Sequence, residues 1–323
     1  MTKSQFEDLP NELLTDIFKN LDARNLFRAF GNLNSRINQL IQSFQYLKLF
    51  CHLHQSNLLK TNEEFFSYYV HTLIVNSWIN FNLQHFPNVQ RLKLDCPLPQ
   101  VLGQLKPQTM PNLKHLSISF VHTMLEMNLL FDRIFANSFQ HLQSCELASH
   151  NDSLKITTYS SSPTITILKL TNIDTLTYQR ILSACSNLRY FQFYLRTKTY
   201  DLPPSLSDPF CQVHYQLKQL SISLDKSNSF LEDNQILQQI LSYLPNLQQF
   251  QLTRICSLEN LINYDWLAST IRLCLLKLRL FKYFIRYSPI DNEIHLQQLI
   301  HQDFSRLHQG HYTAQLILDR ESL

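Results

Sequence analysis

The sequence predicts an α/β protein in which three short N-terminal helices precede a repeat solenoid, a curved parallel sheet with helices and loops on its convex side. Three observations support this class. Apolar residues recur at helical spacing within the first 45 residues. From residue 70 onward, the pattern apolar-x-x-apolar-x-apolar returns about every 26 residues, and 58 of the 323 residues are leucine. Stacked repeats of this period bury a continuous core between neighbouring units.

Three amphipathic helices are expected before residue 48. Pro10 falls in the first turn of the first helix, where its missing N–H costs little. Asp22 is expected to cap the second helix, Gly31 to end it, and a third helix to run from about residue 34 to residue 44. The apolar stripe of the first helix is wider than a small bundle needs. So small a unit should therefore dock on something else.

This segment resembles the F-box, whose pattern is Leu-Pro, a Glu two residues later, Leu-Leu, Ile-Phe, and Leu-Asp before the second helix. These positions are occupied by Leu9, Pro10, Glu12, Leu13, Leu14, Ile17, Phe18, Leu21 and Asp22. The resemblance implies that residues 1–48 are an F-box that inserts apolar side chains into the Skp-type adaptor of an SCF (cullin-RING) ubiquitin ligase. The implied contact residues are Leu9, Pro10, Leu13, Leu14, Ile17, Phe18, Leu21 and Leu26.

The repeats are predicted from nine copies of the apolar pattern. The first positions of these copies are Val70, Val89, Leu113, Leu142, Ile165, Leu188, Leu217, Leu247 and Leu275. A Pro-Asn pair precedes three of them, where the proline ends the previous segment and the asparagine makes the turn without glycine. Helices are expected over 122–138, 175–184 and 230–243, and a loop over 198–209.

The period and the strand pattern resemble leucine-rich repeats, and the order of the two parts resembles the F-box/leucine-rich repeat proteins. We expect the repeat array to span residues 49–288. A C-terminal cap over 289–323 would contain a helix and a short strand from Leu316 to Leu318. The resemblance implies that the array captures the protein substrate of the ligase.

The residues that alternate with the core positions should face the concave side of the array, where partners of such arcs usually bind. In the last copy these residues are Lys277, Arg279 and Phe281. Tyrosine and arginine dominate binding hot spots. The candidate substrate-binding residues are Arg91, Lys93, Tyr190, Tyr194, Lys277 and Arg279. The basic residues near the last copy could indicate nucleic acid or anionic lipid, but a charged sheet edge is the better interpretation.

The sequence contains few signals for chemistry. Only 3 glycines are present, so no phosphate-binding loop can form. The pairs His52-x-His54 and His308-x-x-His311 lack the further ligands of a zinc site, and Cys145 falls in a core position. We therefore expect no enzyme activity, cofactor or metal.

The net charge of +3 is too small to indicate a nucleic-acid partner. The most apolar stretch, 271–286, is interrupted by basic residues, so no membrane association is expected. The N-terminus has no apolar run typical of a secretory signal, and the 7 cysteines show no disulfide spacing. These features indicate a cytoplasmic or nuclear protein.

Two functional hypotheses follow. In the first, the chain is the substrate-recognition subunit of an SCF ubiquitin ligase that binds the adaptor through the F-box and a protein target through the concave face. In the second, the chain is a stand-alone leucine-rich-repeat scaffold with no role in ubiquitin transfer. The segment 31–37, which lacks the tryptophan of the F-box pattern, keeps the second hypothesis open.

Overall fold

The computed structural model describes most of the chain. The described residues are 8–31, 33–43, 49–53, 64–76, 78–121, 124–149, 161–195, 213–224, 230–255, 265–287, 293–308 and 312–320. The chain divides into two compact units. The first contains Met1–Arg133 with Ser138–Glu146, and the second contains Ile134–Asn137 with Leu147–Leu323.

The first unit begins with three helices, α1 (Asn11–Lys19), α2 (Ala23–Phe30) and α3 (Ser35–Ser43). Asp22 caps α2, because one carboxylate oxygen accepts the backbone N–H of Arg24 at 2.9 Å. The other oxygen accepts the N–H of His52 at 2.8 Å and so joins the helices to the first strand. Gly31 follows α2 at a point where an added Cβ would clash with the Phe27 carbonyl oxygen. The predicted N-cap and helix end are therefore confirmed.

The rest of the first unit alternates strands with short helices. Its strands are β1 (Leu49–Leu53), β2 (Val70–Asn76), β3 (Arg91–Asp95), β4 (His115–Val121) and the start of β5 (Ser144–Ser149). Between them lie the 3-10 helices η4 (Glu64–Tyr69) and η5 (Leu83–His85) and the helices α4 (Pro99–Gly103) and α5 (Met124–Phe135). The register is parallel, with Thr72 opposite Arg91 and Arg91 opposite His115.

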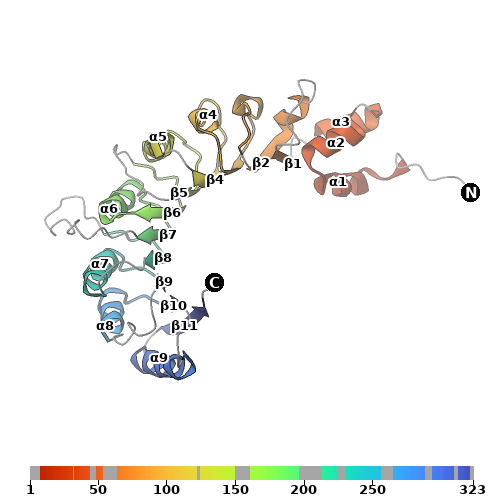
Figure 1. Cartoon of the computed structure of the whole chain (residues 1–323). Coiled ribbons are helices and arrows are strands. Elements are labelled where there is room, and N and C mark those ends of the chain that lie inside the picture. The colour runs from red at the N-terminus through yellow and green to blue at the C-terminus, as the bar shows by residue number, and fades with distance from the viewer. Residues whose placement is uncertain are drawn as a thin grey trace, which may run out of the picture. The chain divides into compact units, whose positions relative to one another are not determined.

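The second unit continues the alternation. Its strands are β6 (Ile167–Ile173), β7 (Tyr190–Leu195), β8 (Gln219–Leu224), β9 (Gln249–Ile255), β10 (Leu280–Tyr287) and β11 (Thr313–Arg320). Its helices are α6 (Thr175–Ala184), α7 (Phe230–Ser242), α8 (Asp265–Cys274) and α9 (Glu293–Leu307), and Figure 1 shows all four on the same side of the strands. Among the described residues, eleven strands pair in chain order from β1 to β11. The predicted α/β class is confirmed.

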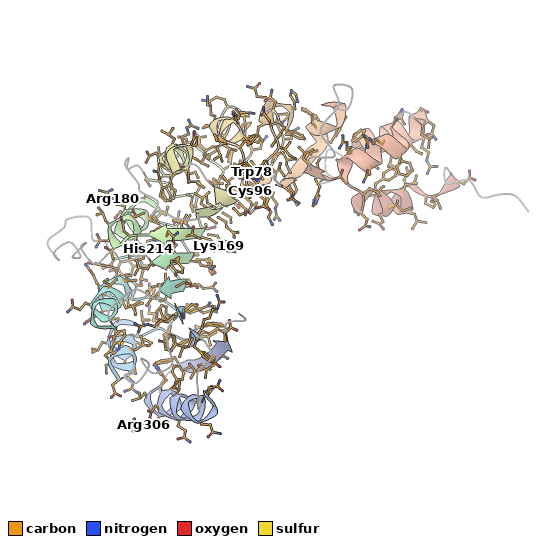
Figure 2. All side chains as sticks on the ribbon, in the orientation of Figure 1. Trp78, Cys96, Lys169, Arg180, His214 and Arg306 are labelled. Atoms are coloured by element: carbon orange, nitrogen blue, oxygen red, sulfur yellow. The ribbon has the colours of Figure 1, made fainter. Side chains whose placement is uncertain are left out.

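Strand residues alternate between a core that faces the helices and an open face. In β7, the buried side chains are Phe191, Phe193 and Leu195. Tyr178 of α6 stacks on Phe191 with ring centroids 5.9 Å apart and an interplanar angle of 4°. A fully buried side chain of this size contributes roughly 1.5–3 kcal/mol relative to its exposed state. Each repeat therefore supplies its own layer of the core, and Figure 2 shows the side chains that fill it.

The turn asparagines have a role that the sequence did not predict. Asn88, Asn187 and Asn246 each donate a side-chain N–H to a backbone carbonyl in the turn of the preceding repeat, at 2.8, 2.9 and 3.0 Å. The φ angles of these asparagines are not positive; the positive-φ non-glycine residues are Cys96, Asn137 and Asn172. The asparagines therefore link neighbouring repeats along the edge where the strands begin, and no glycine is needed there.

The structure corrects the register of the last predicted copy. In the eight earlier copies, the first position and the residues three and five places later are buried, as expected. In the ninth, this pattern starts at Leu278 instead of Leu275, and Phe281 and Tyr283 follow it into the core. Phe281 is 0% exposed, so its predicted place on the open face is wrong. The physical reason is that two overlapping sets of apolar residues fit the pattern: Leu275, Leu278 and Leu280 in the predicted register, and Leu278, Phe281 and Tyr283 in the observed one.

Two other differences concern whole elements. The sequence did not predict β1 or α8, and β11 extends beyond the expected strand 316–318. The described helices include none long and apolar enough to cross a membrane. The predicted loop over 198–209, His54 and His311 lie outside the described residues.

Candidate interaction surfaces

The first candidate surface is an apolar patch on α1, formed by Pro10, Leu13 and Ile17 and called the α1 patch below. Leu13 is 51% exposed and Ile17 is 38% exposed, although both are large aliphatic side chains. They lie four residues apart and therefore on one side of the helix. Pro10, at the start of α1, is exposed as well. Solvent-exposed apolar side chains grouped on a short helix indicate a contact with a partner.

The structure divides the eight predicted adaptor-contact residues into three groups. Leu14, Phe18 and Leu26 are 0% exposed and form the interior of the three-helix domain. Leu9 and Leu21 are half-buried, whereas Pro10, Leu13 and Ile17 are exposed. The wide stripe of α1 thus serves two purposes, because its buried edge holds the domain together and its exposed edge remains on the surface. Leu33, which the sequence did not single out, is also 49% exposed.

Several contacts fix α1 in place. The guanidinium of Arg36 in α3 donates to the Asn11 side-chain oxygen at 2.8 and 3.0 Å. Phe18 of α1 packs on Phe30 of α2 with ring centroids 5.0 Å apart. The α1 patch is therefore presented by a helix that is tied to both of its neighbours.

The second candidate surface is the open face of β6 to β11 in the second unit. Strand register places one residue from each strand in a single row across the sheet, called the central row below. The central row consists of Lys169, Gln192, Ser221, Gln251, Lys282 and Gln315. Figure 2 shows Lys169 on the side of the strands away from the helices, whereas Arg180 of α6 lies on the helix side.

A depression of about 80 Å³ lies on this face across β7 to β10. We call it the Lys282 depression. It is lined by Tyr190, Gln219, Leu220, Ser221, Gln249, Phe250, Gln251, Leu280 and Lys282. Ser221 is only 5% exposed, and the Tyr190 hydroxyl donates to the Gln192 side-chain oxygen at 2.8 Å. The depression is thus lined mainly by neutral hydrogen-bonding groups and one ammonium group.

The six predicted substrate-binding residues do not all lie on this face. Tyr190 and Tyr194 are on the open face of β7, with intermediate exposure. Lys277 and Arg279 precede β10 and fall outside the strand. In the observed register of β10, Lys282 takes the open-face position that the predicted register gave to Arg279. The sequence analysis therefore did not select Lys282 as a substrate-binding residue. The sequence signal that could have identified it is the alternation of Phe281, Tyr283 and Ile285 with residues that include Lys282 and Arg286.

Arg91 and Lys93 belong to β3 in the first unit, where both are exposed. On the same face, the Asp95 carboxylate accepts the Ser119 hydroxyl at 2.9 Å. Burial, with the charges of Arg91 and Lys114, lowers the pKa of His115 below its usual value. This part of the first unit therefore carries both signs of charge.

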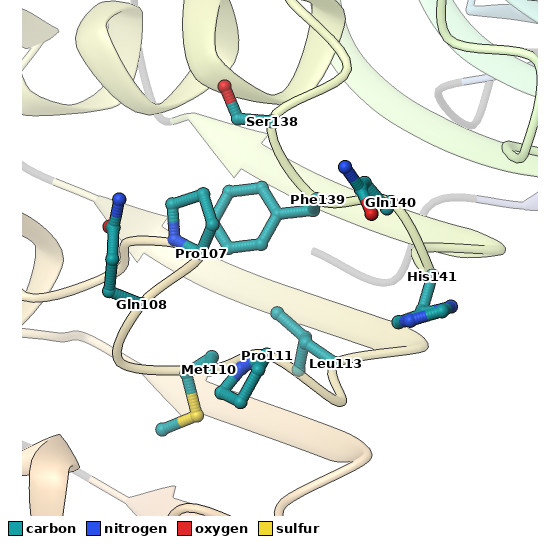
Figure 3. A pocket seen from close by; sticks show the side chains of 9 residues that line it. All are labelled: Pro107, Gln108, Met110, Pro111, Leu113, Ser138, Phe139, Gln140 and His141. Atoms are coloured by element: carbon teal, nitrogen blue, oxygen red, sulfur yellow. The ribbon is translucent and has the colours of Figure 1, made fainter.

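An edge cleft in the first unit was not predicted. It has a volume of about 340 Å³ and lies where the turns before β4 and β5 meet. Its lining is Pro107, Gln108, Met110, Pro111, Leu113, Ser138, Phe139, Gln140 and His141, as Figure 3 shows. The clustering of Pro107, Met110 and Pro111 is the sequence signal that could have drawn attention to it.

Titratable groups in the core are structural. Cys145 is fully buried, in the core position predicted for it. Burial, with the nearby Asp22 carboxylate, raises the pKa of the Cys51 thiol to about 12, and burial also raises the pKa of Cys185. Burial, with the Arg272 charge, lowers the pKa of His308 to about 4, and its Nδ1 lies 2.7 Å from the Tyr312 hydroxyl. Within the described ranges, no group of three or more His, Cys, Asp or Glu side chains is placed to hold a metal ion.

Comparison with known proteins identifies the N-terminal part. Residues 6–49 match the family model of the F-box domain. F-box proteins are non-catalytic adaptors, so this match supports the expectation that the chain is not an enzyme. No curated protein matches the chain.

Proposed function

We propose that the chain is the substrate-recognition subunit of an SCF ubiquitin ligase. The observation that carries this proposal is the α1 patch, a group of exposed apolar side chains inside the segment that matches the F-box. Pro10, Leu13 and Ile17 would insert into the Skp-type adaptor in the helix-in-groove mode. Leu14, Phe18 and Leu26 would support them from within.

The strand-and-helix units supply the second half of the proposed receptor. We propose that residues 49–288 form leucine-rich repeats, with the F-box over 1–48 and a cap over 289–323. The parallel pairing in chain order, the period of about 26 residues and the one-sided helices of the second unit support this assignment. A protein target would bind the open face, in the cytoplasm or the nucleus.

The proposed role is positional. The cullin and RING subunits would bring a charged conjugating enzyme near a target held on the open face. Tethering of this kind raises the effective concentration of one reactant around the other, without chemistry from the receptor itself.

Co-purification with a Skp-type adaptor tests the proposal. The double variant Leu13→Asp, Ile17→Asp should lose the adaptor, because two carboxylates would have to be desolvated in an apolar groove. Leu129→Asp is the matched control, since Leu129 is 48% exposed on α5, outside the F-box match. Unchanged adaptor binding by the double variant would overturn the proposal and leave a repeat scaffold without a ubiquitin role.

A further inference from the structure

The Lys282 depression has an unusual charge composition. Its lining includes one cation, Lys282, and no carboxylate. Among the described residues of β6 to β11, the acidic residue on the open face is Asp319, which pairs with Arg286 at 3.2 Å. Arg286 lies four residues beyond Lys282, roughly 13 Å along β10. Lys282 itself makes no ion pair within the described part of the chain.

The residues beside Lys282 carry hydrogen-bond donors. Gln251 on β9 is the strand partner of Lys282, and Ser221 on β8 is the partner of Gln251. Adjacent strands are about 4.8 Å apart, so these side chains lie side by side. Gln249 and Gln219 flank them in the neighbouring row. Carboxamides and hydroxyls can therefore surround a negative charge held by the ammonium group.

The size of the depression limits its occupant. About 80 Å³ accommodates one short side chain, whereas small-molecule and cofactor sites usually enclose roughly 300–1,000 Å³. Leu280 and Tyr190 border it and can pack against an aliphatic stem. A small acidic side chain with one or two methylene groups matches both the volume and this border.

Resting on the proposed function, we propose that the Lys282 depression binds one aspartate or glutamate side chain in an extended segment of the target protein. The carboxylate would lie against the Lys282 ammonium group and accept hydrogen bonds from the Gln249 and Gln251 carboxamides. The rest of the central row then offers Gln192 and Gln315, whose amides can pair with both the N–H and the C=O groups of a peptide backbone.

A phosphorylated side chain fits less well than a carboxylate. Phosphate recognition typically uses clusters of arginine or several cations. The other lysine of the central row, Lys169, is four strands from Lys282, roughly 19 Å across the sheet. A single positive charge in the depression therefore matches a singly charged ligand.

Peptide selection on the full chain tests the inference. A random twelve-residue peptide library should yield binders that share one fixed acidic position. For a synthetic peptide of the enriched sequence, Lys282→Gln should weaken binding roughly tenfold, as expected for losing a hydrogen bond to a charged group. Replacing the peptide acid by its amide should weaken binding to the natural chain equally, and should add little once Lys282 is replaced.

Lys106→Gln is the matched control. It removes the same charge from an exposed residue outside the depression, and it should leave the dissociation constant unchanged. The inference is overturned if no acidic position is enriched, if the two lysine variants behave alike, or if a phosphoserine peptide binds more than tenfold tighter than its glutamate counterpart.

Adaptor co-purification, measured in parallel, separates the two proposals. If the natural chain and Lys282→Gln both retain the adaptor but show no preference for acidic peptides, only the proposal of the acidic site is refuted. If neither chain retains the adaptor, but the effects of replacing Lys282 and the peptide acid still depend on each other, the ligase role is refuted and the acidic site is supported.

Discussion

Phe281 distinguishes the observed register of β10 from the register that the sequence favours. Its ring is 0% exposed and lies 5.4 Å from the Phe250 ring, 6.1 Å from Phe304 and 5.2 Å from His308, between centroids. Phe281→Ala removes a large core side chain and several aromatic pairs. Such a truncation costs about 3–5 kcal/mol, and each aromatic pair contributes about 0.5–1.5 kcal/mol beyond area burial. We therefore expect Phe281→Ala to lower the free energy of unfolding by an amount in the upper part of the range of about 3–5 kcal/mol.

Urea denaturation followed by near-ultraviolet circular dichroism measures the loss in the free energy of unfolding. Phe284→Ala is the matched control, because Phe284 lies three residues further along β10 on the half-buried open face. It should cost about 1 kcal/mol or less, as expected for a residue outside the core. If Phe284→Ala were the more damaging variant, the register described here for β10 would be refuted.

Three further outcomes are expected. Gly31→Ala should lower the free energy of unfolding, measured by heat or urea, by roughly 1–3 kcal/mol, because the new Cβ would clash with the Phe27 carbonyl. Gly103→Ala is the control and should leave the free energy of unfolding unchanged, since no atom lies within 4 Å of its Cβ position. Asp22→Ala should lower the free energy of unfolding by about 1–2 kcal/mol, because it removes both the cap of α2 and the acceptor for the His52 N–H; an unchanged free energy of unfolding would contradict the cap. His308 should lower the free energy of unfolding by up to about 3 kcal/mol between pH 6.5 and pH 4, because it binds its proton more readily in the unfolded chain. His308→Phe should make the fall smaller by that amount and leave the part due to His115 and His214, whose pKa values are also lowered by burial.

The sequence predicts the repeats well because each buried strand carries its own pattern. Eight of the nine predicted copies have the observed register, and the helices over 175–184 and 230–243 agree with α6 and α7 to within a residue. The last copy fails because Leu278, Phe281 and Tyr283 fit the apolar pattern as well as Leu275, Leu278 and Leu280 do. Only the aromatic cluster around Phe281, built from residues far apart in the chain, selects one of them.

The surfaces are harder to predict than the core. The spacing of Leu13, Leu14, Ile17 and Phe18 defines a stripe, but not which edge of it α2 and α3 cover. Local spacing says nothing about packing partners, so three predicted contact residues prove to be interior. The Lys282 depression likewise depends on the lateral register of strands that are about 30 residues apart.

The asparagine links between turns also bear on how this chain tolerates changes in length. Asn88, Asn187 and Asn246 each stand three residues before the first residue of their strands, although the repeats themselves differ in length. Insertions are therefore accommodated after each strand, while the segment that enters it stays constant. A target-specific loop or an engineered tag added on the strand-exit side would leave the hydrogen bonds between turns intact. The same addition next to an asparagine would separate two repeats.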